Sequence, residues 1–82
     1  MVMVYIDPEF QKLFSKIMDV VLKEKIIKQI NKLKENPEVG KPMRFGRKGS
    51  RELYISPFRL SYVHNREEDC IMILDLFHKD MQ

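Results

Sequence analysis

The chain has 82 residues, which is room for one domain, and we expect residues 1–82 to form it. Hydrophobic residues make up 44% of the sequence and charged residues 33%, a balance typical of a folded globular domain and not of a disordered chain. The formal net charge is only +3, but residues 41–51 carry five basic residues and no acidic one. Such a segment favours a polyanionic partner, and a solvated loop is the alternative interpretation.

Cys70 is the only cysteine, so an internal disulfide is impossible and a thiolate metal site is not expected. We expect neither a metal nor a cofactor. The first residues lack the pattern of a signal peptide, and no apolar run approaches the length of a membrane span. These features predict a cytoplasmic protein that does not contact a membrane.

The first strand and the first helix are predicted from the N-terminal residues. Residues 1–6 place alternate apolar side chains on one face, as a short strand does. Asp7 and Pro8 then predict a helix start, because aspartate caps free amides and proline is tolerated at the first helical position. The apolar residues that follow keep helical spacing and form one stripe: Phe10, Leu13, Phe14, Ile17 and Met18.

A second helix is predicted after Asp19, which is a second potential cap. It ends before Pro37, because the residue preceding a proline is pushed out of the helical region. Its apolar stripe consists of Leu22, Ile26, Ile30 and Leu33. Both stripes predict packing against a core rather than a ligand pocket.

Three strand-like runs follow, at residues 51–56, 58–64 and 70–77. Ser56 and Pro57 give a tight connection between the first two runs, and the polar residues 65–69 predict an exposed hairpin loop. The sequence therefore predicts an α+β fold, in which an N-terminal strand and two antiparallel helices precede three antiparallel strands that form one curved sheet. The helices are expected to cover one face of that sheet.

Arg59 and His78 are the candidates for chemistry on an RNA backbone. Alternation places Arg59 on the strand face opposite Phe58 and Leu60, and a guanidinium there can hold two phosphate oxygens. An ion pair with a carboxylate such as Glu52 is the alternative. His78 stands at the end of the last strand, where an imidazole can exchange protons near neutral pH or play a structural part.

Other residues are candidates for RNA binding. Four basic residues would contact the RNA backbone, an interaction that carries little sequence information: Arg44, Arg47, Lys48 and Arg51. Tyr54 and Phe45 can stack on a base, although Tyr54 is equally compatible with a half-buried strand position. His64 shares its strand face with Leu60 and is expected to be structural.

The order of these parts resembles the RelE/ParE superfamily, the small toxins of prokaryotic type II toxin–antitoxin pairs. Two motifs carry the resemblance: an aromatic-Arg-Leu-x-Tyr strand, read here as Phe-Arg-Leu-Ser-Tyr at residues 58–62, and a last apolar strand that ends in His78 and Lys79. The resemblance implies a RelE-like fold and a cognate antitoxin bound in a hetero-oligomer. It also implies metal-independent cleavage of mRNA on the ribosome, in the A site, with Arg59, His78 and Lys79 as catalytic residues.

Two departures from the family keep other functions open. Many members have a tyrosine or further basic residues soon after the last strand, where this sequence ends at Gln82. The lysines that some ribosome-dependent members carry in the second strand are replaced here by Glu-Leu-Tyr-Ile at residues 52–55. A ParE-like toxin that inhibits DNA gyrase by protein contact is therefore an alternative, as is a non-catalytic RNA- or protein-binding relative.

Overall fold

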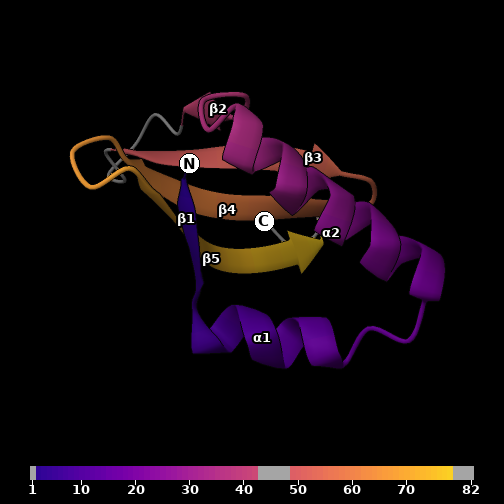
Figure 1. Cartoon of the computed structure of the whole chain (residues 1–82). Helices are drawn as coiled ribbons and strands as arrows, with labels where there is room; N and C mark the ends of the chain where they lie inside the picture. Colours follow the sequence, from indigo (N-terminus) through magenta and orange to yellow (C-terminus); the bar gives the residue numbers. More distant parts are fainter. Residues whose placement is uncertain (1, 43–48, 79–82) are drawn as a thin grey trace.

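The computed structural model describes residues 2–42 and 49–78. In chain order, two helices follow the first strand and precede the other four strands (Figure 1). The elements are β1 (Met3–Ile6), α1 (Pro8–Ser15), α2 (Val20–Glu35), β2 (Lys41–Pro42), β3 (Ser50–Ile55), β4 (Phe58–Asn65) and β5 (Cys70–His78). The predicted α+β fold, with its N-terminal strand, two helices and three-stranded antiparallel run, is confirmed. The site candidates Arg44, Phe45, Arg47, Lys48 and Lys79 lie outside the described residues.

The five strands form one sheet in the order β1-β5-β4-β3-β2. β3 pairs with β4 and β4 with β5 in antiparallel fashion, whereas β1 lies parallel to β5. A parallel pair needs a long crossover connection, which the two helices provide between β1 and the remaining strands. β2 was not predicted, because two residues at the start of a basic run show no periodicity; it pairs Lys41 with Glu52 at the far edge of the sheet.

Both helices begin at the predicted caps. The Asp7 carboxylate accepts a hydrogen bond from the Glu9 amide at 2.8 Å, and that of Asp19 accepts one from the Leu22 amide at 3.2 Å. α2 ends at Glu35, directly before the residue that precedes Pro37, as predicted. No helix in residues 2–42 and 49–78 is long and apolar enough to cross a membrane.

The core lies between the helices and one face of the sheet (Figure 1). Its buried members are Phe10, Ile26, Leu33, Ile55, Leu60, Tyr62, Ile71, Ile73 and Leu76. We call this side of the sheet the covered face. Two residues of the predicted first stripe do not belong to the core: Leu13 is 37% exposed, and Met18, which follows the end of α1, is 94% exposed.

The other side of the sheet is the open face. It carries the strand residues that alternate with the covered ones, among them Glu52, Tyr54, Arg59, Ser61, Asp75 and Phe77. A register shift next to Ser61 skips Leu74, so that Ile73 and Leu76 both reach the covered face despite their odd spacing. The irregularity thus allows one strand to contribute apolar side chains to the core along its whole length.

Candidate functional site

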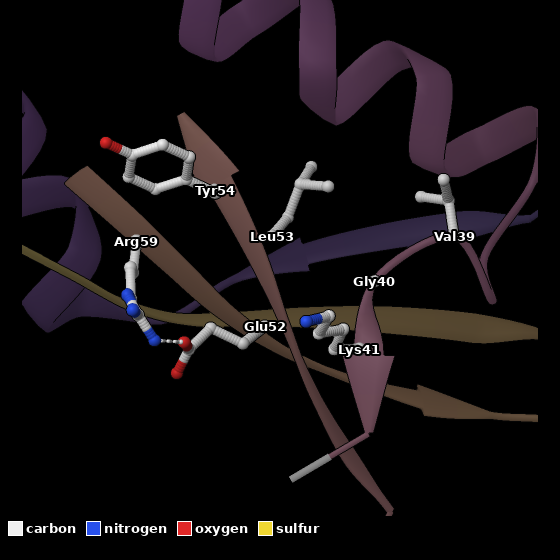
Figure 2. Close-up of a pocket in the computed structure, with 7 residues that line it drawn as sticks. All are labelled: Val39, Gly40, Lys41, Glu52, Leu53, Tyr54 and Arg59. Carbon is white, nitrogen blue, oxygen red and sulfur yellow. Dashed lines mark hydrogen bonds and ion pairs between the residues drawn. The ribbon is translucent and has the colours of Figure 1, made fainter. Parts of the chain in front are cut away.

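A pocket of about 240 Å³ lies where the connection after α2 meets β3 and β4 (Figure 2). The residues that line it are Val39, Gly40, Lys41, Glu52, Leu53, Tyr54 and Arg59. The pocket therefore brings together two basic side chains, one carboxylate and one phenol. These are groups that can bind an anion and transfer a proton.

Strand pairing explains how the charged residues meet. Lys41 and Ser61 are the two neighbours of Glu52 across the sheet, and Tyr54 is the neighbour of Arg59. Paired residues project from the same face, so all five belong to the open face. Arg59 lies diagonally across from Glu52, and its Nη1 donates a hydrogen bond to Glu52 Oε1 at 2.5 Å (Figure 2).

The Arg59–Glu52 ion pair is partly shielded from water, with side chains 37% and 14% exposed. Arg59 thus lies on the face that alternation predicted, with the carboxylate partner that the sequence offered as the alternative. A guanidinium has five N–H donors, and the bond to Glu52 involves one nitrogen. Within the described part of the chain, Arg59 Nε and Ser61 Oγ are buried without a hydrogen-bond partner. Arg59 therefore keeps donor capacity for a second acceptor.

His78 does not lie beside Arg59. It pairs with Phe58 across β4 and β5, and Phe58 packs against the core. The His78 and Phe58 rings meet edge to face, with centroids 5.6 Å apart at an interplanar angle of 78°. Because Arg59 pairs with Phe77, the register places the imidazole and the guanidinium on opposite faces of the sheet.

Arg51 projects from the covered face, opposite to Tyr54, the other RNA-binding candidate that the structure describes. Its Nη1 donates to the backbone carbonyls of Glu38 at 3.0 Å and Gly40 at 2.7 Å, on the covered face. Tyr54, by contrast, is 53% exposed at the rim of the pocket, and its hydroxyl donates to Ser56 Oγ at 3.4 Å. The structure therefore brings Arg59 and Tyr54 together and separates Arg51 from them.

Two charged residues of the pocket, Glu52 and Lys41, were not among the candidate site residues. Glu52 entered only as an ion-pair partner, and Lys41 only as the first member of the basic segment. Sequence pattern could not bring these two residues together, because Lys41 lies opposite Glu52 only through the pairing of β2 with β3. Among the residues that the structure describes, no group of three or more His, Cys, Asp or Glu could hold a metal ion.

The fold is shared with solved toxin structures. The Escherichia coli RelBE toxin–antitoxin complex contains a chain with a TM-score of 0.82 and 16% identity, the match covering 95% of this chain and 96% of that one. A chain of the RelBE2 toxin–antitoxin complex from Mycobacterium tuberculosis has a TM-score of 0.81 and 23% identity, and the match covers 95% of this chain and 98% of that one. The YoeB/ParE toxin from Agrobacterium tumefaciens has a TM-score of 0.81 and 14% identity, and the match covers 94% of this chain and 98% of that one.

Sequence comparison gives the family. No curated protein sequence matches the chain. The profile of the family described as the ParE toxin of the type II toxin–antitoxin system parDE, however, matches residues 4–82, nearly the whole chain. The resemblance drawn from the strand motifs is therefore confirmed, and the chain belongs to the ParE toxin family of type II toxin–antitoxin systems, within the RelE/ParE superfamily.

Proposed function

We propose that this toxin acts on RNA and cleaves mRNA in the ribosomal A site without a metal ion. The observation that supports the proposal best is the pocket itself, where Arg59, Lys41 and Glu52 meet on one face of the sheet. Two cations can hold a phosphodiester, and a carboxylate beside them can accept a proton. Tyr54 adds an exposed ring on which a base can stack.

The cleavage step needs only groups of this kind. The ribose 2′-oxygen forms a bond to phosphorus while the bond from phosphorus to the 5′-oxygen breaks. The 2′-hydroxyl proton passes to the Glu52 carboxylate, and the leaving 5′-oxygen takes a proton from the Lys41 ammonium. Arg59 stabilises the charge that develops on the phosphate oxygens. His78 is not assigned the acid role here, because it stands on the other face.

A second candidate is inhibition of DNA gyrase by protein contact. The matching family is described as a ParE toxin, and Arg59 already has a carboxylate partner while the imidazole lies elsewhere. In that case the open face binds a protein surface, and no proton transfer is required. The pocket groups would then contribute to binding alone.

A reconstituted translation reaction separates the two candidates. Purified toxin, dialysed against a chelator beforehand, is added to ribosomes programmed with a defined mRNA in their magnesium buffer, and primer extension maps any cuts. A supercoiling assay with purified gyrase runs in parallel. Ribosome-dependent cuts by the dialysed toxin support the RNA function, and Arg59→Ala should lose them. If the toxin inhibits supercoiling and makes no cuts, we would abandon the RNA function in favour of gyrase inhibition.

We also propose a cognate antitoxin as the protein partner. The similar Escherichia coli and Mycobacterium tuberculosis structures are toxin–antitoxin complexes. An antitoxin that binds only the native toxin would raise its stability, and one that covers the pocket would silence it. Co-purification with the product of the adjacent gene tests this. We would abandon the toxin function if that product does not bind and expression of the chain alone never slows growth.

A further inference from the structure

The segment between α2 and β2, residues 36–40, brings Val39 and Gly40 to the pocket. Lys41, the first residue of β2, follows directly and also lines the pocket. A connection of this kind has no ladder of its own to fix its backbone. Two side chains of the covered face supply the missing contacts. We infer that Tyr62 and Arg51 are positioning residues that hold this segment so that Lys41 stands beside Glu52 and Arg59 in the pocket, a role that rests on the proposed RNA function.

Tyr62 provides the first part of the contact. It is fully buried, and its hydroxyl accepts a hydrogen bond from the Gly40 amide and donates one to the Pro37 carbonyl, both at 2.9 Å. Burial raises the pKa of Tyr62 above its ordinary value of 10.0, although the Gly40 amide and the Arg51 charge act in the opposite direction. The phenol therefore stays protonated at neutral pH and can keep both bonds.

Arg51 provides the second part. It is the cross-strand partner of Tyr62, and its Nη1 donates to the carbonyls of Glu38 and Gly40. One arginine–tyrosine pair thus makes four hydrogen bonds to the backbone of residues 37–40. Bonds from a charged donor are stronger than neutral ones. The segment is consequently anchored at both its amide and its carbonyl groups.

Gly40 lets the segment approach this closely. A Cβ at position 40 would lie 2.6 Å from Tyr62 Oη, 2.9 Å from Tyr62 Cε1 and 3.0 Å from the Glu52 carbonyl oxygen. Only glycine fits against the phenol there. Because the next residue is Lys41, which pairs with Glu52, a shift of Gly40 would also move the backbone of Lys41 relative to Glu52. The anchor on the covered face is in this way coupled to the charge on the open face.

The test compares Tyr62→Phe, which removes only the hydroxyl, with Lys41→Ala and with the double variant. Tyr5→Phe is the matched control, since Tyr5 is 49% exposed on β1 at the other edge of the sheet. Amide hydrogen exchange reports the segment without RNA. Affinity for a short single-stranded RNA, measured by fluorescence anisotropy over a range of salt concentrations, reports the pocket. If Tyr62→Phe does not fold, Arg51→Gln takes its place.

We expect faster exchange at residues 38–41 in Tyr62→Phe, with the exchange of β4 and β5 unchanged. The salt dependence of binding should fall by about 0.7 in log–log slope, the loss of one phosphate contact to a single strand, in Tyr62→Phe and in Lys41→Ala alike. In the Lys41→Ala background, Tyr62→Phe should weaken binding no further. Such non-additivity is the mark of two residues that act through one contact.

Other outcomes overturn the inference in distinguishable ways. Additive losses, or unchanged exchange in residues 38–41, would leave Tyr62 as a structural residue only, with the proposed RNA function intact. A parent protein that binds no RNA, while it also fails to cut mRNA on the ribosome, would overturn the proposed function and the positioning role together.

Discussion

Two arginine–tyrosine pairs cross the β3–β4 hairpin, one on each face of the sheet. Arg51 faces Tyr62 on the covered face, and Arg59 faces Tyr54 on the open face. Tyr62 is fully buried, whereas Tyr54 is 53% exposed. Arg51 donates to two backbone carbonyls, whereas Arg59 donates to a carboxylate at the edge of a pocket. The two pairs consist of the same residue types, but they have different partners because they lie on opposite faces of the sheet.

Strand register, more than residue type, therefore decides the role of each arginine in this sheet. Both arginines are basic residues near a basic segment, and both were candidates for RNA contact. A one-residue slip of either strand would move its own arginine to the other face of the sheet. The covered face holds the chain together and anchors the segment before β2, while the open face presents charge. Variants that affect stability and activity separately can test this division.

The largest effect on stability is expected from Ile26→Ala. Ile26 is fully buried against the covered face, so its truncation should lower the free energy of unfolding by about 2–5 kcal/mol. Ile27→Ala is the neighbouring control, since Ile27 is 49% exposed and should change stability by roughly 0.5 kcal/mol or less. Urea denaturation followed by circular dichroism measures both. Equal losses would mean that α2 does not pack as described.

The largest effect on activity is expected from Arg59→Ala. Loss of a preorganised charge donor costs on the order of a hundredfold in rate, so RNA cleavage and toxicity should nearly disappear while the fold remains. Arg66→Ala is the control, because Arg66 is a 71% exposed arginine that pairs with Glu38 outside the pocket. Primer extension on programmed ribosomes gives the rate. A folded Arg59→Ala variant as active as the parent would remove the phosphate-stabilising role.

Arg51→Ala should affect stability directly. Its loss leaves two carbonyl groups without their charged donor, and we expect the free energy of unfolding to fall by about 1–3 kcal/mol. The free energy of unfolding should fall less in Arg59→Ala, because that variant loses an ion pair with Glu52 in which the arginine side chain is already 37% exposed. Thermal denaturation of Arg51→Ala and Arg59→Ala under the same conditions shows which variant is less stable. The reverse order would contradict the division between the two faces.

The smallest effect is a dependence of stability on alkaline pH. Because the pKa of Tyr62 is raised in the folded state, the stabilisation is complete below 10.0 and is lost as pH rises from there through the folded-state pKa. In that pH window, one group changes the free energy of unfolding by at most about 1.4 kcal/mol per pH unit. Urea denaturation from pH 9 to 12 should show a shallower decline in Tyr62→Phe than in the parent.

Much of the fold was predictable because local chemistry and periodicity agree along the chain. Asp7 and Asp19 cap the two helices, Pro37 follows the end of α2, and the runs after residue 50 pair as three antiparallel strands. β2 was missed because two residues carry no period. Met18 was placed in a stripe that the end of α1 excludes.

The candidate site was predictable only in part. Alternation within β4 placed Arg59 on the open face, because that argument needs no other strand. The separation of His78 from Arg59 depends on the pairing of β4 with β5, which links His78 to Phe58. The anchoring of Arg51 depends on a segment that approaches from another part of the chain. Neither contact leaves a trace in local sequence pattern.

Local sequence was enough to predict where both helices begin, where α2 ends, which strand residues alternate, and that an arginine stands in an apolar strand, since all of these depend on neighbours along the chain. It did not predict that α1 ends at Ser15. Three contacts could be established only from the folded structure: Glu52 pairs with Arg59, Lys41 completes their pocket, and Tyr62 anchors Gly40. These contacts join residues 7 to 22 positions apart, and they exist only once strand register and the path of the α2–β2 connection are fixed.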